Sequence, residues 1–147
     1  MPRALILTLG YEGLSLDAFI RQLSAAGVTT VVDVRDLPLS HKRGFSKRPL
    51  AEALTDAGID YRHVKALGCP KPIRDELKKI GDRDSYFRKF RDHLRRQDDA
   101  LSELGKIIDS STACLICFER DPALCHRSIV AESVAKKTGA TVRHLHP

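Results

Sequence analysis

The chain has 147 residues, of which 42% are hydrophobic and 30% charged. This length suits one domain around a single core, and the composition excludes disordered and fibrous proteins. The formal charge of +6 favours a phosphate-bearing small molecule or a nucleic acid over an acidic protein as partner. The longest apolar runs, ALILTL and ACLICF, are too short to cross a bilayer. We therefore expect one cytoplasmic domain over residues 1–147 that does not bind membranes.

Short apolar runs alternate with helical periodicity along the chain, which is typical of βαβ units and a parallel sheet. Five runs predict strands, which lie within residues 4–11, 28–36, 59–68, 111–119 and 141–147. The expected helices are 15–27, 46–58, one short and one long helix within 70–109, and 126–139. The third strand carries charge at alternate positions, so we expect it at an edge of the sheet.

Capping residues and periodicity refine the helices. Ser15 is the expected N-cap of the first helix and Gly27 the residue just beyond its end. In the long helix apolar residues recur at intervals of three and four, interrupted at Gln97. Basic and acidic residues alternate on its other face, which is typical of a solvated helix rather than of a nucleic-acid surface.

These elements predict an α/β fold with three layers. We expect a mostly parallel five-stranded sheet in the order 3-2-1-4-5, with helices on both faces. In such sheets ligands bind beyond the carboxyl ends of the strands, where the strand order reverses. Strands one and four would then flank a crevice in which three polar segments converge: 10–13, 33–35 and 119–127.

The first segment, GYEG, places Tyr11 and Glu12 between two glycines. Glycines allow a tight turn and the close approach of a ligand. The segment matches neither the dinucleotide fingerprint nor the phosphate-binding loop of nucleotide hydrolases. The alternative is a plain turn with a solvated Glu12.

The second segment places Asp33 and Arg35 on the same face of a strand, since they are two residues apart. Charged groups at the end of a buried strand must be paired. They form either a structural ion pair or part of a site in which Arg35 binds an anion.

A basic loop, HKRGFSKR (41–48), follows and ends with Ser46 and Lys47 at the expected start of a helix. Backbone amides, a hydroxyl and several cations at a helix start suit a phosphate group. The alternative is a solvated basic loop without a ligand.

The third segment, CFERDPALCHR, carries Glu119, Cys125, His126 and Arg127. A thiol at a helix N-terminus has a lowered pKa, so Cys125 could be a nucleophile. His126 could be a neutral acid, base or donor, and Arg127 an anion-binding group. The alternative is that Cys125 is a small buried residue and His126 a hydrogen-bonding group at the helix start.

The four cysteines are expected as free thiols, because nothing marks the chain as secreted. Cys114 and Cys117 point to opposite faces of a strand and therefore cannot share one zinc ion. A phosphatase loop built on Cys117 would need an arginine where Ala123 stands. We expect no metal and no cofactor.

As a set, TLGYEG, VVDVRDLPLS, GFSK and CFERDPALCHR resemble the domain-of-unknown-function family 488, which includes the small YeaO-like proteins. The match runs through nearly the whole chain. The resemblance implies a compact α/β fold without an established reaction, and Cys69 departs from the family pattern. The positions that carry the resemblance are Gly10, Tyr11, Glu12, Asp33, Arg35, Phe45, Ser46, Lys47, Cys117, Glu119, Cys125, His126 and Arg127.

The leading hypothesis is a hydrolase or transferase acting on a nucleotide, a nucleic-acid end or another phosphate-bearing molecule. One of Glu12 and Glu119 would activate water or attack a sugar carbon, while the other carboxylate or His126 protonates the leaving group. The arginines would hold the phosphate. The alternatives are a non-catalytic nucleic-acid-binding module built on the basic loop and thiol chemistry at Cys125.

Overall fold

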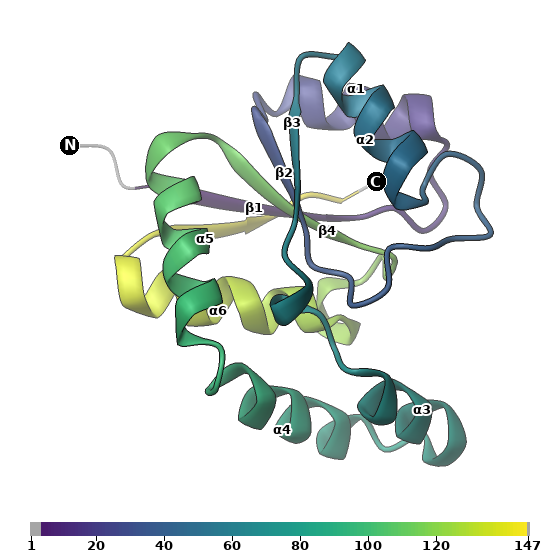
Figure 1. Ribbon diagram of the computed structural model, residues 1–147, viewed down its shortest axis with the longest axis vertical. Helices are drawn as coiled ribbons and strands as arrows, with labels where there is room; N and C mark the ends of the chain where they lie inside the picture. The colour runs from purple at the N-terminus through teal and green to yellow at the C-terminus, as the bar shows by residue number, and fades with distance from the viewer. Residues whose placement is uncertain (1–3, 147) are drawn as a thin grey trace.

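Five parallel strands form the sheet in the computed structural model, which describes residues 4–146 (Figure 1). The strands are β1 (Leu5–Gly10), β2 (Thr30–Asp33), β3 (Asp60–His63), β4 (Ala113–Cys117) and β5 (Thr141–His144). Each lies within a predicted range, and every pairing is parallel. The edge position of β3, predicted from its charge pattern, is confirmed.

The strand order is β3-β2-β4-β1-β5, so the predicted order 3-2-1-4-5 is wrong in exchanging β1 and β4. β4 lies between β2 and β1, where Ala113 is in register with both Thr30 and Ile6. β1 and β4 are both almost entirely buried, so their hydrophobicity does not reveal which of them is central. The adjacency of β1 and β4, on which the predicted crevice depends, is confirmed.

Helices cover both faces of the sheet, which confirms the three layers (Figure 1). On one face, α1 (Leu16–Ala25) and α2 (Lys47–Asp56) pack Phe19 and Leu50 against side chains of β1 and β2. On the other face, α5 (Asp98–Ser110) and α6 (His126–Thr138) pack Leu104 and Val130 against the sheet. Alternate residues of β1, β2 and β4 contribute to the two cores, as the pleat of a strand requires.

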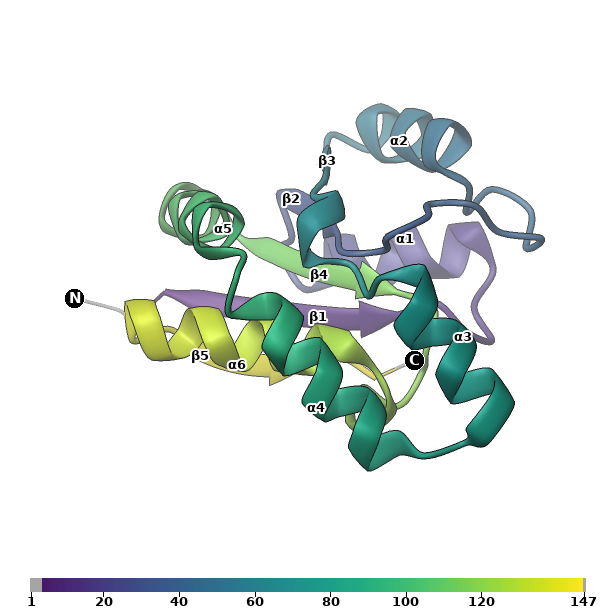
Figure 2. The same ribbon diagram turned by 60° about the horizontal axis from the view of Figure 1, so that its bottom comes forward.

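Two further helices, α3 (Lys71–Ile80) and α4 (Arg83–Leu94), form a hairpin beside α6 (Figure 2). The ring of Phe90 in α4 lies 5.1 Å from that of His126 in α6. α3 buries none of its ten residues completely and is joined to α4 by an ion pair between Glu76 and Lys89. The hairpin thus extends past the carboxyl ends of the strands with only α4 packed firmly on the core.

The expectation of one long helix is wrong, because α4 ends at Leu94 and α5 begins at Asp98. Gln97, which interrupts the apolar stripe, is the N-cap of α5 and has a non-helical backbone (φ −111°, ψ 40°). A polar residue at a core position therefore marked a helix boundary. In the described part of the chain, no helix is both long and apolar enough to span a membrane.

The caps of α1 follow the sequence prediction. The Ser15 hydroxyl accepts a hydrogen bond from the backbone N–H of Ala18 at 3.1 Å, and Gly27 follows the helix with a φ of +76°. A positive φ at this position favours glycine. This turn leads the chain directly into β2.

Candidate functional site

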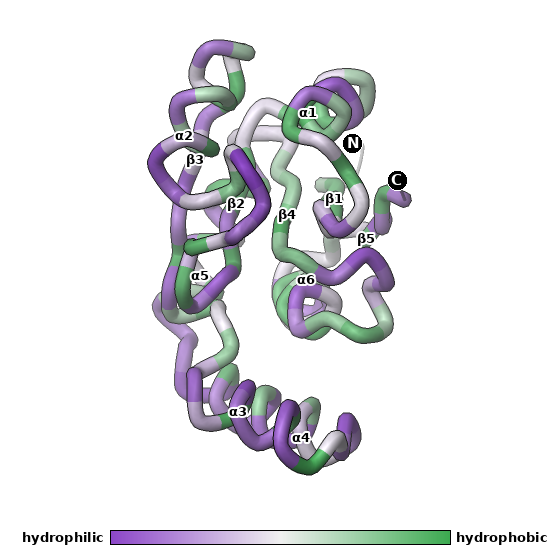
Figure 3. The backbone as a smooth tube through the Cα atoms, turned by 90° about the vertical axis from the view of Figure 1, so that its right-hand side faces the viewer, coloured by the Kyte–Doolittle hydropathy of each residue, from purple (hydrophilic) through white to green (hydrophobic). Residues whose placement is uncertain are grey.

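The carboxyl ends of β1, β2 and β4 open into a cavity of about 550 Å³, a volume typical of small-molecule sites. Tyr11 after β1, Arg35 after β2 and Glu119 after β4 line it from the sheet, and Lys78 and Tyr86 line it from the α3–α4 hairpin. Figure 3 views the molecule from this side, with the hydrophobic strands β1 and β4 above and the hairpin, of mixed hydropathy, below. The cavity therefore joins four segments that are distant in sequence.

An apolar rim surrounds part of this cavity. Among the described residues, four of the five large apolar side chains that are exposed also line the cavity: Leu37, Leu39, Phe118 and Leu124. Exposed apolar side chains gathered at one place mark a surface that binds a ligand or partner.

The walls of the cavity carry more positive than negative charge. Four cations line it together with two carboxylates: Arg35, Arg74, Lys78 and Arg83 with Asp36 and Glu119. The three cations of α3 and α4 were not among the predicted site residues, because Lys and Arg on an amphipathic helix are typical of a solvated face. The sequence feature that could have indicated these cations is that all three lie within the short segment 74–83.

Arg35 is held in place by bonds to several neighbours. Its guanidinium donates to both carboxylate oxygens of the buried Asp33, at 2.9 and 2.7 Å, and to the backbone carbonyl of Phe45 at 2.7 Å. Burial opposes the charge, but the hydrogen bonds and charge of Asp33 outweigh it and raise the pKa of Arg35 above its ordinary value. Asp33 and Arg35 thus form the structural ion pair that was one of the two predicted alternatives. Arg35 also borders the cavity.

Tyr11 is buried between Arg35 and the basic loop. Its ring stacks on Phe45 with centroids 4.4 Å apart, and its hydroxyl accepts a hydrogen bond from the Arg35 guanidinium at 3.2 Å. Tyr11 and Arg35 are therefore bonded to each other, and both line the cavity.

Ser46 and Lys47 lie away from the cavity. Ser46 begins α2, but its hydroxyl accepts from the backbone N–H of Ser40 at 3.0 Å instead of capping the helix. Lys47 is exposed. The basic loop thus contributes to the cavity indirectly, through the Phe45 carbonyl that holds Arg35.

Glu12 and Glu119 lie near each other, as the convergence of the strand ends predicts. Both line a second hollow of about 410 Å³, but only Glu119 also borders the main cavity. A carboxylate oxygen of Glu12 accepts a hydrogen bond from the backbone N–H of Arg120 at 3.0 Å. Burial and, to a lesser extent, the charge of Glu12 raise the pKa of Glu119 above its ordinary value.

The turn at Gly10 fixes this arrangement. The backbone N–H groups of Tyr11 and Glu12 donate to the carbonyls of Cys117 and Phe118, at 3.0 and 2.9 Å. A Cβ atom at Gly10 would overlap the backbone carbonyl of Glu119. Glycine is therefore needed here because the chain after β4 approaches the backbone closely, and a ligand plays no part in that contact.

Arg127 faces the protein interior. Its side chain is fully buried, and its guanidinium donates to the carbonyl of Glu119 at 2.5 Å and to that of Arg120 at 3.4 Å. Burial lowers its pKa to about 10, which still leaves it charged at neutral pH. Arg127 does not line the cavity and instead shapes the loop that carries Glu119.

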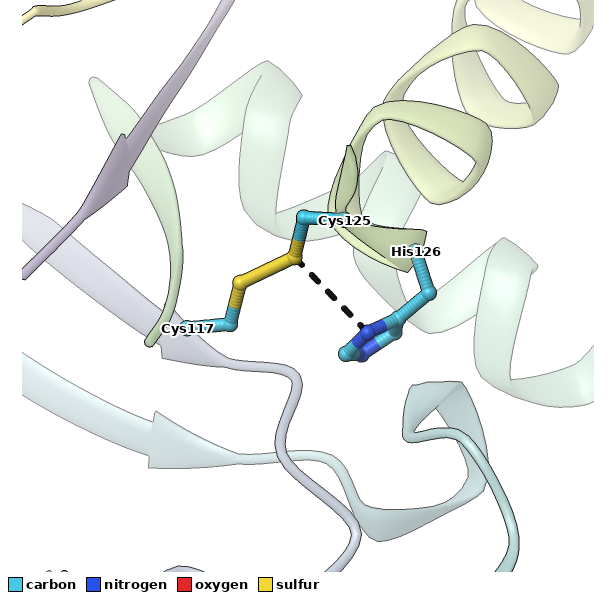
Figure 4. A group of neighbouring side chains, drawn as sticks. All are labelled: Cys117, Cys125 and His126. Carbon is cyan, nitrogen blue, oxygen red and sulfur yellow. Dashed lines mark hydrogen bonds between the residues drawn. A yellow bond between two sulfur atoms is a disulfide. The ribbon is translucent and has the colours of Figure 1, made fainter. Parts of the chain in front are cut away.

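The expectation that all four cysteines are free is wrong for two of them. Cys117 at the end of β4 and Cys125 at the start of α6 are paired as a disulfide, whereas Cys69 and Cys114 are free and buried (Figure 4). The segment between the paired cysteines, residues 118–124, brings the strand end onto the helix start. Cys114 lies in the opposite core from Cys117, which agrees with the argument against a shared zinc ion.

His126 is buried next to this pair. Its Nε2 atom lies 2.6 Å from the Val34 carbonyl, and its Nδ1 atom lies 3.8 Å from the Cys125 sulfur (Figure 4). A carbonyl accepts hydrogen bonds only, so Nε2 carries the proton and Nδ1 is unprotonated. Burial lowers the pKa of His126 to about 4, so the ring is neutral at physiological pH.

A family model described as domain of unknown function DUF488 matches residues 15–134 of the chain. No curated protein and no solved structure matches it. The matched range contains the cavity-lining residues that follow β2, those of the hairpin and those of the loop after β4.

Proposed function

The chain belongs to the DUF488 family, whose description assigns no activity, and we propose from its cavity that it is a hydrolase or transferase acting on a small phosphate-bearing molecule. The observation that carries the proposal is an open cavity of about 550 Å³ lined by four cations and two carboxylates. An excess of positive charge in a cleft attracts anionic ligands. Arg35 and Arg74 are paired with Asp33 and Asp36, so Lys78 and Arg83 are the cations best placed to bind a phosphate.

The apolar rim narrows the class of ligand. Leu37, Leu39, Phe118 and Leu124 expose 53%, 67%, 47% and 37% of their surface at the mouth of the cavity. Such side chains favour the part of a ligand that carries no charge, such as a nucleobase. A nucleotide, with a phosphate for the cations and a base for the rim, therefore fits the cavity better than inorganic phosphate does.

Glu119 is the residue best suited to move a proton. It is a half-buried carboxylate on the cavity wall, where it can take a proton from water or from an attacking hydroxyl group. His126 is less suited, since Nε2 is bonded to a backbone carbonyl and Nδ1 faces a sulfur. Glu12 does not line the main cavity, and it assists because, in addition to burial, its charge raises the pKa of Glu119.

The first experiment measures the melting temperature of the protein with phosphate, AMP, ADP-ribose, NAD or a short oligonucleotide. A ligand at a hundred times its Kd stabilises the folded state by about 2.7 kcal/mol, which raises the melting temperature by several degrees. We expect AMP, ADP-ribose or NAD to give the largest shift. The shift should fall in Lys78→Ala, which removes a cavity cation, and persist in Lys79→Ala, which removes the neighbouring lysine outside the cavity.

A shift with the oligonucleotide alone, erased by salt and retained in Lys78→Ala, would instead favour the nucleic-acid-binding module. The exposed cations Arg43, Lys47 and Arg48 of the basic loop would then be the contacts. Where a nucleotide binds, its hydrolysis should be lost in Glu119→Gln and retained in Glu103→Gln, a change on the exposed face of α5. Equal turnover in the two variants would contradict the role of Glu119.

A further inference from the structure

Three potential metal ligands that line the cavity lie next to one another (Figure 4). The Sγ atoms of Cys117 and Cys125 and a ring nitrogen of His126 all lie within 4.8 Å of one another. The three side chains are buried, and each lines the cavity. Two sulfurs and an imidazole form the ligand set that zinc prefers over magnesium or calcium.

The orientation of His126 suits metal binding. Its Nε2–H donates to the Val34 carbonyl at 2.6 Å, so the lone pair of Nδ1 points toward the sulfurs. Histidines that bind metals usually donate their other ring N–H to a carbonyl or carboxylate, which fixes the tautomer and the ring. The Cys125 Sγ to Nδ1 distance of 3.8 Å matches the separation of about 3.3–3.8 Å that zinc bonds of about 2.0–2.3 Å imply between tetrahedral ligands.

Both sulfurs receive hydrogen bonds that favour a thiolate once the cysteines are reduced. The Arg127 guanidinium lies 3.4 Å from the Cys117 sulfur, and the backbone N–H of Arg127 donates to the Cys125 sulfur at 3.5 Å. A nearby cation and a helix N-terminus both stabilise thiolates, and metals bind cysteine as the thiolate.

The backbone spacing leaves room for a metal ion. The Cα atoms of Cys117 and Cys125 are 7.7 Å apart. After reduction, the two sulfurs can separate and hold an ion between them, and the backbone segments that carry them need not come closer.

We propose that the reduced chain binds one Zn²⁺ through Cys117 Sγ, Cys125 Sγ and His126 Nδ1, with the fourth coordination position open to the cavity. Three protein ligands and one open position are the arrangement of catalytic rather than structural zinc sites. The disulfide and the metal exclude each other, since the disulfide has no thiolate to offer. The site stands independently of the phosphate-bearing ligand proposed above.

Co²⁺ can replace Zn²⁺ in such sites and absorbs visible light there, so it tests the proposed zinc site directly. Reduced, metal-free protein titrated with Co²⁺ should show a thiolate-to-cobalt charge-transfer band that saturates at one equivalent and disappears when Zn²⁺ is added. Cys117→Ser, Cys125→Ser and His126→Gln should each lose the band or bind cobalt at least tenfold more weakly. Cys69→Ser, which changes another buried cysteine of the same cavity, should keep it.

A second measurement needs no variant and so does not depend on how the variants fold. In reduced wild-type protein, one equivalent of Zn²⁺ should protect Cys117 and Cys125 from alkylation. The absence of the cobalt band in the reduced protein, an equal band in the disulfide form, or alkylation at the same rate with and without Zn²⁺ would each overturn the proposal.

Discussion

Arg127 has the largest side chain among the fully buried residues that the structure describes. Its guanidinium bonds the carbonyls of Glu119 and Arg120, while its Nε atom has no partner. A buried charge without such bonds would cost several kcal/mol. Arg127 is therefore a structural cation that orders the loop after β4, and sequence analysis could not distinguish this role from anion binding because both require an arginine at the start of the helix.

Arg127→Met should destabilise the protein by about 2–4 kcal/mol, since it leaves two carbonyls without their donor in a buried place. Urea unfolding measures the difference. Arg120→Ala, which truncates an exposed arginine of the same loop, should change the free energy of unfolding by no more than about 0.5 kcal/mol. If Arg127→Met lowers the free energy of unfolding by less than about 1 kcal/mol, the hydrogen bonds from Arg127 to the loop contribute little to stability.

The alkylation rate of Cys69, which lines the cavity, reports how strongly burial affects its thiol. Burial raises the pKa of its thiol to about 11, so the thiol stays protonated at pH 8 and its thiolate fraction rises until the pH passes that value. We expect iodoacetamide to modify Cys69 in the folded protein at least about 100-fold more slowly at pH 8 than in the unfolded chain, and faster with each added pH unit. Peptide mass spectrometry measures both rates, and equal rates would contradict the burial of this side chain.

At the scale of elements, the strands were predictable and their order was not. Apolar runs located the buried strands β1, β2 and β4, and alternating charge located the edge strand β3, because these patterns are local properties of the sequence. The exchange of β1 and β4 depends on which of two equally buried strands pairs with β2, and no residue in either strand encodes that choice. Similarly, Gln97 broke the apolar stripe of the long helix, but only the fold shows that the chain turns there.

Gly10→Ala should destabilise the protein by roughly 1–3 kcal/mol, because the added Cβ would overlap the carbonyl of Glu119 and push the loop away from β1. Gly105→Ala is the matched control. Its Cβ would lie 3.5 Å from a methyl group of Thr138, an ordinary contact, and alanine should stabilise α5 by about 0.5–1 kcal/mol. Thermal unfolding measures both changes, which should have opposite signs. A gain in stability in Gly10→Ala would contradict the close contact at this turn.

At the scale of the whole molecule, the cavity depends on topology more than on any one motif. Sequence analysis predicted that the ends of β1, β2 and β4 converge, and Tyr11, Arg35, Glu119, Cys125 and His126 do line one space. It missed the opposite wall, because the α3–α4 hairpin is linked to the strand ends only by the tertiary fold. Whether these residues bind a ligand stays a prediction.

The most direct test is an NMR titration of ¹⁵N-labelled protein with AMP, in which amide shifts show where the ligand binds. The perturbed amides should gather in three segments that border the cavity: 35–39, 77–83 and 118–126. The shifts should saturate together, as expected for one site. Perturbations confined to the basic loop at 41–48, or no binding at millimolar AMP, would contradict the claim that this cavity is the functional site.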